Sequence, residues 1–349
     1  MVAELLAAFD TLWDGSAQQE PPLAALTFPL VDQQGECRTS LPGYADLMLA
    51  GMVGAAAAGL GAAPDEPEAP PLRILAGVSG SGSWPSVSAR TRELLHVAAP
   101  LNEQPEHPFR LLVQPPGCLQ VYHRPSGRAL QLQTTAAGLP PWEPGAPLRN
   151  FLHWHLAAPH RALLHAGTLG IGGDGVLLVG EGGSGKSGTV LAGIRHGLQT
   201  VGDDYVLGCL DDGVSVHPLF RGLRQDPDGW RRVGLAPDLQ RFPLNWQGKQ
   251  QLTLEQVGAA PFVPRLRIRA VLLPVVTGSA TTRLEPVDRR QAFMALAPSS
   301  LFQISGDRGT QFRFCAELVR RLPCFRLLLG TDPAEISGQI TGWLERRTA

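Results

Sequence analysis

The sequence is poor in cysteine and in net charge, and each shortage excludes a class of protein. Its 349 residues include five cysteines, which are scattered and contain no C-x-x-C pair. This pattern argues against a disulfide framework and against a zinc site, and it fits a reducing cytoplasm. Lysine and arginine total 30 against 31 for aspartate and glutamate, so the net charge is -1. Such a chain offers no basic footprint for duplex nucleic acid or an anionic membrane, and we expect neither as a partner.

Long hydrophobic runs are also lacking. Residues 1–6 contain no basic region followed by an apolar core, so the sequence predicts no signal peptide. Residues 47–63 are uncharged, but most are alanine or glycine. They fall short of the roughly 18 strongly apolar residues that a membrane span requires. We therefore expect a small-residue helix in a protein core at this position, and a cytoplasmic location for the chain.

The most informative stretch that is present is GEGGSGKS at residues 180–187, which follows an apolar run at residues 176–179. It fits the Walker A pattern G-x-x-x-x-G-K-[ST], whose backbone N–H groups close around phosphates while the lysine neutralises charge and the hydroxyl binds magnesium. A helix is predicted to begin near Lys186 and to direct its positive dipole end at the anion. The alternative is a glycine-rich turn, which the flanking strand and helix patterns disfavour. Side chains are expected to obstruct the loop at Gly182, Gly183 and Gly185. The residues expected to contact the nucleotide are Gly180, Gly182, Gly183, Ser184, Gly185, Lys186, Ser187 and Gly188.

Proline-rich segments divide the chain. Residues 65–71 are typical of a surface linker, and residues 140–145 mark a domain boundary near residue 145. We predict a mixed α+β domain at residues 1–145, with a possible role in substrate or partner binding, and a catalytic α/β domain at residues 146–349. A second glycine-rich string at residues 77–83 has no lysine and predicts a flexible loop. In the first domain, strands are expected at residues 72–76, 109–113, 119–123 and 130–133, and a helix at residues 88–98.

The second half alternates short apolar runs with longer amphipathic segments, which is typical of an α/β protein. Strands are predicted at residues 162–164, 176–179, 198–201, 205–209, 214–217, 268–276 and 325–329. Helices are predicted at residues 148–157, 187–196, 289–296, 311–321 and 333–346.

An aspartate pair, Asp203-Asp204, follows the strand predicted at residues 198–201, directly after the phosphate loop and its helix. Ligands bind outside the carboxyl ends of strands in α/β sheets, so this position favours a functional pair. In phosphoryl transfer to a hydroxyl, two carboxylates can divide the tasks of metal ligand and general base. A solvated Asp-Asp turn is the alternative.

These motifs, in this order, resemble the HPr kinase/phosphorylase family, whose catalytic domain is related to phosphoenolpyruvate carboxykinases. Members carry an Arg-Ala-x-x-His-Gly-like stretch before the phosphate loop and an Ala-Asp-Asp-like stretch after it. This chain has RALLHAG at residues 161–167 and VGDD at residues 201–204. The match covers residues 161–207. It implies a P-loop catalytic domain of the HPr kinase/PEP carboxykinase-like type in the second half.

The resemblance also implies roles for single residues. Lys186 would be the phosphate-binding lysine, Ser187 and Asp203 would ligate Mg²⁺, and Asp204 would be the base that activates the acceptor hydroxyl. His165 would assist at the phosphates or position Asp204. In the family's reverse reaction, in which inorganic phosphate attacks a phosphoserine, Asp204 would act as the acid.

The chain departs from the family pattern at two places. Gly188 stands where HPr kinases usually have a glutamate, and their Glu-x-Arg-Gly-Leu-Gly-like segment is represented by LFRGL at residues 219–223. A second metal-binding carboxylate is therefore missing from the motif, and Asp226 or Asp228 is the candidate replacement. Nearby arginines, Arg221 and Arg224, would either stabilise the transferring charge or form surface salt bridges.

Two further patterns have simpler interpretations. Lys249 and the alternating arginines of residues 265–269 predict one solvated face of a strand, with a peptide-docking face as the alternative. The histidines within residues 153–160 are not expected to form a metal site, because positions two apart on a helix do not share a face. Packing or surface roles are expected for them instead.

Together these features predict an ATP- and Mg²⁺-dependent kinase that phosphorylates a serine hydroxyl in a protein or peptide. Relatives in this class phosphorylate precursor peptides of ribosomally made natural products, such as lasso peptides, and the departures at residues 188 and 219–223 favour a peptide over the phosphocarrier HPr. The alternatives are an HPr(Ser) kinase/phosphorylase, a small-molecule kinase and a non-catalytic nucleotide-binding module. The sequence leaves open the acceptor, the phosphoryl donor, the reverse reaction and whether the chain forms a homo-oligomer.

Overall fold

The computed structural model describes residues 2–16, 22–54, 70–86, 98–114, 117–136, 139–260 and 262–348. Its backbone contacts separate two compact units with mixed α/β structure. Among the described residues, the first unit comprises those up to residue 156 together with residues 304–309, and the second comprises the rest. The sequence places the boundary near residue 145, whereas the first unit extends through the next helix. Most of the helix predicted at residues 88–98 and of the linker predicted at residues 65–71 lies outside the described residues.

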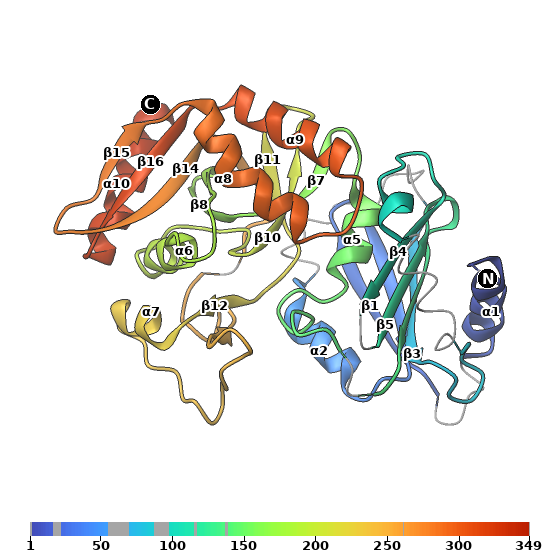
Figure 1. Cartoon of the computed structure of the whole chain (residues 1–349). Coiled ribbons are helices and arrows are strands. Elements are labelled where there is room, and N and C mark those ends of the chain that lie inside the picture. The colour runs from blue at the N-terminus through green and yellow to red at the C-terminus, as the bar shows by residue number, and fades with distance from the viewer. Residues whose placement is uncertain are drawn as a thin grey trace. The chain divides into compact units, whose positions relative to one another are not determined.

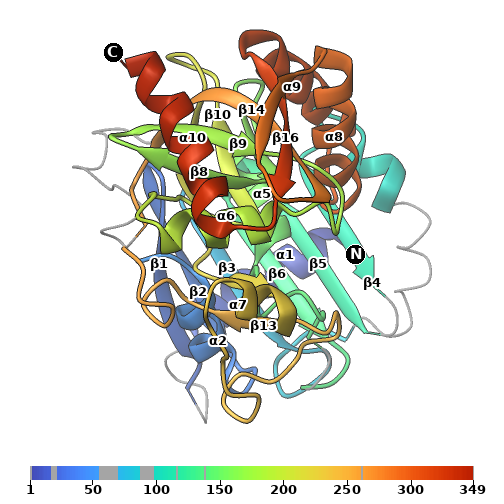
Figure 2. The same cartoon turned by 90° about the vertical axis from the view of Figure 1, so that its left-hand side faces the viewer.

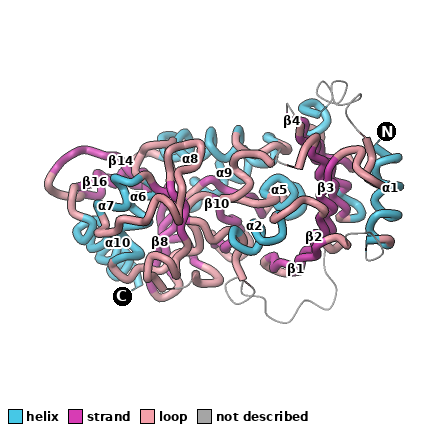
Figure 3. Tube along the Cα trace, turned by 90° about the horizontal axis from the view of Figure 1, so that it is seen from below, coloured by secondary structure: helices cyan, strands magenta, loops and turns pink. Residues whose placement is uncertain are grey.

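The first unit is built on a mixed sheet with the strand order β1-β2-β3-β6-β5-β4. The helix α1 packs on one face through Phe9, Leu12 and Trp13, and Figure 3 shows it beside β3. The helix α5 belongs to this unit because its polar side chains bond to the sheet, as in the 2.8 Å hydrogen bond from Asn150 to Gln120. The bounds are α1 Val2–Asp14, β1 Ala24–Leu30, β2 Gln33–Thr39, α2 Tyr44–Gly51, β3 Leu72–Val78, β4 Phe109–Gln114, β5 Cys118–His123, η2 Arg124–Ser126, β6 Arg128–Gln133 and α5 Arg149–Leu156.

The four strands predicted in the first half are confirmed, and one loop prediction is partly wrong. The glycine-rich string at residues 77–83 begins inside β3, which continues to Val78. Gly77 is needed there for packing, because a Cβ atom at this position would lie 2.4 Å from the indole ring of Trp84. The glycine therefore marks a close contact between β3 and the segment that follows it, and is not part of a flexible linker.

The second unit holds an eight-stranded sheet with the path β15-β16-β14-β11-β10-β7, in which β9 pairs with β14 and β8 pairs with β9. A separate two-stranded sheet joins β12 to β13. The strands are β7 Arg161–His165, β8 Gly167–Ile171, β9 Asp174–Leu178, β10 Tyr205–Cys209, β11 Ser215–Pro218, β12 Leu223–Gln225, β13 Gln250–Leu252, β14 Leu266–Ser279, β15 Arg283–Pro286 and β16 Cys324–Gly330. The helices are α6 Lys186–Arg195, α7 Pro227–Arg232, α8 Arg289–Phe302, α9 Arg308–Arg321 and α10 Pro333–Thr348.

Helices cover both faces of this sheet (Figures 1 and 2). One hydrophobic cluster joins the sheet to α8 and α9, through residues such as Leu296 and Phe314. The other joins it to α6 and α10, through residues such as Leu191 and Ile340. Neighbouring residues of β14 point into opposite clusters, which is the two-residue period of a strand buried on both sides. The part of the chain that the structure describes contains no helix long and apolar enough to cross a membrane.

Candidate active site

The phosphate loop connects the end of β9 to the first turn of α6. Its backbone takes positive φ at Gly180 (152°), Gly183 (84°) and Gly185 (103°), a region that favours glycine. A Cβ atom at Gly185 would also lie 2.5 Å from Cδ1 of Leu329. The obstruction expected at Gly182 and Gly183 is not found within the protein, because a Cβ atom at either position would have no neighbour within 4 Å.

Lys186 is the first residue of α6, and its side chain folds back over the loop. Its Nζ donates to the backbone oxygens of Gly180 and Glu181, the latter at 3.0 Å. Burial lowers the pKa of this ammonium, and the nearby carboxylate of Asp203 opposes that shift. A buried cation held by loop carbonyls at a helix N-terminus is suited to bind an anion in their place.

The strand predicted at residues 198–201 does not form, and this correction explains how the aspartate pair is positioned. Only an isolated bridge joins Gln199 to Gly170 of β8. Beyond it, Thr168 Oγ1 accepts hydrogen bonds from the backbone N–H groups of Val201 (3.0 Å) and Gly202 (3.2 Å). Threonine hydroxyls thus replace the strand ladder and fix the segment that precedes Asp203.

Asp204 lies beside His165 because β7 and β10 are antiparallel, with His165 opposite Tyr205. The ladder extends by one bond, 3.1 Å from the N–H of Ala166 to the carbonyl of Asp204. This register brings His165 Nε2 to 2.9 Å from Asp204 Oδ1. The histidine backbone is held in turn by a 3.1 Å hydrogen bond to Ser300 Oγ. His165 is therefore placed to orient Asp204.

Arg221 and Arg224, for which the sequence allows the same two interpretations, have different surroundings in the structure. Arg224, on β12, forms an ion pair with Oδ2 of Asp204, and both side chains are mostly buried, with exposed fractions of 12% and 21%. Arg221 instead pairs at 3.2 Å with Glu255, whose side chain is 62% exposed. The charge-stabilising interpretation thus fits Arg224, and the surface salt-bridge interpretation fits Arg221.

Asp203 is buried next to the loop, and burial raises the pKa of its carboxyl group. A hydrogen bond from Ser187 and the positive charges of Arg224 and Lys249 oppose that shift. Its Oδ1 atom has no hydrogen-bond partner among the residues that the structure describes. A serine hydroxyl close to a carboxylate with an open oxygen fits the Mg²⁺ site of a phosphate loop, which uses one or two protein oxygens plus phosphates and water. The described residues contain no cluster of three or more His, Cys, Asp or Glu side chains that could hold a metal ion. A Mg²⁺ site at a phosphate loop does not require such a cluster.

Lys249 is a residue that the sequence reading missed, since we expected it on a solvated strand face. It precedes β13, whose first residue, Gln250, pairs with Gln225 of β12. From there its charge lowers the pKa of both Lys186 and Asp203. A signal for it was present in the composition. Of the 30 basic residues, only Lys186 and Lys249 are lysines, and arginine supplies the other 28. A chain that uses arginine almost everywhere retains lysine at these two positions, which share one electrostatic environment.

The candidate replacements for the missing carboxylate have other tasks. Asp226 caps α7, accepting a 2.7 Å hydrogen bond from the N–H of Gly229. Asp228 pairs with Arg231 at the surface. Next to the loop serine, Gly188 faces Gln225, whose Nε2 would lie 3.5 Å from a Cβ atom at Gly188. A neutral amide therefore occupies the neighbourhood of the departure at Gly188.

The comparisons with known proteins find likenesses among solved structures. No protein-family model and no curated protein matches the chain. Among solved structures, it is similar to the HPr(Ser) kinase/phosphatase from Coxiella burnetii, with 15% sequence identity and a TM-score of 0.28. The match covers 54% of this chain and 99% of that one. Identity and TM-score are both low, so this likeness carries no conclusion about function.

Proposed function

We propose that the chain is an ATP- and Mg²⁺-dependent kinase that transfers a phosphoryl group to a serine hydroxyl of a peptide or protein. The observation that carries this proposal is the surroundings of Asp204. A carboxylate held by His165 and Arg224 directly follows Asp203, whose carboxyl group interacts with the phosphate-loop serine, Ser187. A non-catalytic nucleotide site has no use for a positioned carboxylate of this kind.

Each residue has a task in this reaction. The loop N–H groups and Lys186 would bind the terminal phosphates, and Ser187 and Asp203 would hold Mg²⁺, which would neutralise negative charge on the phosphate oxygens. Asp204 would accept the proton of the acceptor hydroxyl as its oxygen bonds to the γ-phosphorus. The bond from that phosphorus to the bridging oxygen breaks, and ADP leaves. His165 would orient the base.

Asp204 has the capacity for this task. A carboxylate has about four lone-pair sites on two oxygens, and His165 and Arg224 use only some of them. Its side chain is 21% exposed, so an acceptor hydroxyl has access to it. The arginine would also be positioned to offset negative charge on the transferring group.

A peptide is the acceptor that the surface beside Lys249 supports. The segment between α7 and β13 exposes three large apolar side chains, Leu239 (55%), Leu244 (48%) and Trp246 (61%). The same segment holds Lys249, whose N–H donates to Asn245 Oδ1 at 3.0 Å. Several exposed apolar side chains on one segment are typical of a surface that binds another chain. A precursor peptide of a ribosomal natural product is the substrate of this chemistry that we favour.

The test is phosphoryl transfer from labelled ATP to a pool of serine-containing peptides, with Asp204→Asn as the decisive variant. Loss of a general base predicts a rate about 100- to 10,000-fold lower, while ATP still binds. Asp211→Asn is a matched control, because Asp211 is exposed and lies 3.8 Å from His160 at the surface. A transfer rate that Asp204→Asn leaves unchanged contradicts the assignment of the base. Transfer to metabolites but to no peptide contradicts the acceptor class.

A further inference from the structure

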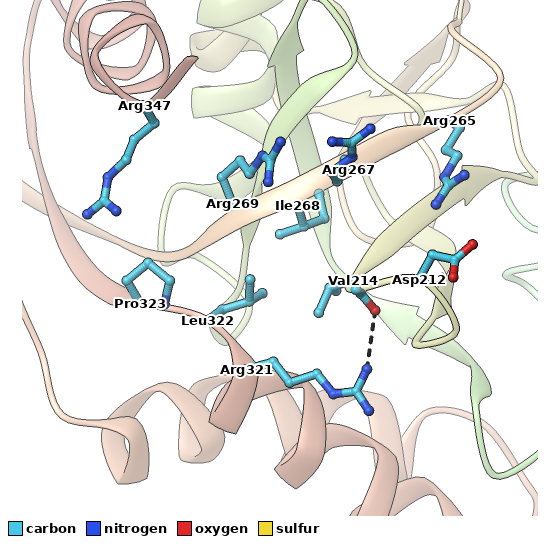
Figure 4. A pocket seen from close by; sticks show the side chains of 11 residues that line it. Asp212, Val214, Arg265, Arg267, Ile268, Arg269, Arg321, Leu322, Pro323 and Arg347 are labelled. Carbon is cyan, nitrogen blue, oxygen red and sulfur yellow. Dashed lines mark hydrogen bonds between the residues drawn. The ribbon is translucent and has the colours of Figure 1, made fainter. Parts of the chain in front are cut away.

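A cavity of about 700 Å³ in the second unit is lined by five arginines. Figure 4 shows Arg265, Arg267 and Arg269 along the start of β14, with Arg321 on α9 and Arg347 on α10. The single acidic residue in the lining is Asp212. Such a concentration of one charge is unusual in a chain whose net charge is -1.

Part of this charge is already neutralised. Arg269 forms a bidentate pair with Asp174, at 2.9 and 3.2 Å. Arg321 donates to Glu317 at 2.7 Å and to the carbonyl of Leu210 at 2.6 Å. These contacts hold two guanidinium groups in place at the wall of the cavity.

The remaining arginines have no acidic partner among the residues that the structure describes. Arg265 and Arg267 lie two apart on an extended backbone, so they share a face, and both are exposed. Arg347 lies over the ring of Trp343, with its Cζ atom 5.3 Å from the centroid. Guanidinium groups present planar pairs of N–H donors that match phosphate and carboxylate oxygens. Three such groups, from two elements, line the cavity.

The cavity is distinct from the phosphate loop. Asp174, which binds Arg269, is the first residue of β9, whereas the loop begins at Gly180 beyond the other end of that strand. At roughly 3.3 Å per residue, the two lie about 20 Å apart along the strand. The cavity volume falls within the roughly 300–1,000 Å³ of small-molecule sites.

We propose that this cavity binds a small molecule carrying two or more anionic groups, phosphate or carboxylate, at a site separate from the nucleotide. The ligand spans the guanidinium groups of β14 and α10, and the paired arginines fix the walls between them. This site does not depend on the kinase assignment.

The experiment is calorimetric titration of the full chain carrying Lys186→Ala, which weakens anion binding at the phosphate loop. Tripolyphosphate and citrate are the probes, and they distinguish a phosphate ligand from a carboxylate ligand. We expect binding of one or both with a stoichiometry of one, weakened at least about tenfold by Arg265→Gln with Arg267→Gln, because each substitution removes charged hydrogen bonds. Arg290→Gln with Arg346→Gln removes the same charge from exposed positions outside the cavity and is expected to leave the affinity within about twofold.

Two results would overturn the proposal. One is that neither probe binds to the parent variant. The other is that the two double substitutions weaken binding equally, which would indicate only the overall field of the protein. If the β14 variant unfolds, Arg347→Gln on α10 serves as the second variant, and an unchanged affinity for it would likewise contradict the site.

Discussion

Replacement of Lys249 by glutamine tests whether this residue is part of the phosphate site. The structure links Lys249 to two groups there, because its charge lowers the pKa of both Lys186 and Asp203. The side chain is half-buried, so solvent screens it only in part. Lys249→Gln would remove this charge, and Lys249→Arg would keep it.

The expected loss of affinity follows from Coulomb's law. Two unit charges about 8 Å apart interact by about 2 kcal/mol at an effective dielectric constant of about 20. Loss of one such interaction with the phosphates would weaken ATP binding about thirtyfold at neutral pH. Lys249→Arg should recover most of this difference.

The pH profile gives a second readout, and its sign is fixed by Asp203. Burial already raises the pKa of this carboxyl group, and Lys249, Arg224 and a hydrogen bond from Ser187 act against the shift. Without Lys249 the pKa rises further, so the carboxylate is protonated at a higher pH. Because only the ionised form ligates Mg²⁺, the Mg²⁺-dependent part of ATP affinity should be lost at a higher pH as the solution is acidified.

The measurement is titration of ATP with and without Mg²⁺ between about pH 5.5 and 8.5, across the range where a raised carboxyl pKa is visible. Arg241→Gln is the control, since Arg241 is an exposed cation in the same segment and lies over the ring of Phe242. Lys249 is not part of the phosphate site if Lys249→Gln changes neither the affinity for ATP nor the pH at which its Mg²⁺-dependent part is lost. The same conclusion follows if Arg241→Gln changes these two quantities as much as Lys249→Gln does.

Three further predictions concern the loop and its neighbours. Gly185→Ala should lower the free energy of unfolding by about 2–4 kcal/mol, because the residue has φ of 103° and its Cβ atom would collide with Leu329. Gly182→Ala should change the free energy of unfolding by less than about 0.5 kcal/mol. Chemical denaturation of the two variants and the parent protein measures this difference. Arg224→Gln should slow phosphoryl transfer at least about tenfold, while Arg221→Gln, at a surface pair, should leave the rate nearly unchanged; equal rates for the two would contradict the role of Arg224. Asp226→Ala should reduce stability by about 1 kcal/mol through loss of the α7 cap, with Mg²⁺-ATP affinity preserved, and a large loss of that affinity would instead identify Asp226 as a metal ligand.

Local patterns allowed most elements of the second unit to be predicted. The phosphate loop, α6, the buried strands β9 and β10 and the partly buried strand β16 follow from short apolar runs and glycine positions. The strand predicted at residues 198–201 failed because hydroxyl groups of Thr168 and Thr200 compete for the backbone. The apolar residues of this segment are still buried. The hydrophobic pattern therefore predicted their burial correctly, but it wrongly predicted the hydrogen bonds of a β-strand.

The neighbours of Asp204 show where reasoning from sequence alone stops. His165 was found from a motif, and the antiparallel register of β7 and β10 explains why it lies beside the aspartate. Arg224 is close in sequence to Arg221 and equally basic, and no local feature separates them. Their difference arises because β12 pairs with β13 and packs against α6, which brings one arginine to the site and leaves the other at the surface.

Lys249 is the most distant of these groups in sequence and illustrates a different kind of signal. Periodicity assigned it to a solvated face, yet the scarcity of lysine already set it apart. Lysine and arginine differ chemically, since the ammonium is a compact point charge and the guanidinium a planar fork. At an exposed ion pair either residue can supply the charge. At a phosphate site the two geometries are not equivalent, because the ammonium contacts oxygens as a point charge and the guanidinium needs a matching pair of acceptors. Lys249→Arg is therefore expected to recover affinity for ATP but not the full rate of transfer, whereas complete recovery of both would show that only the charge matters.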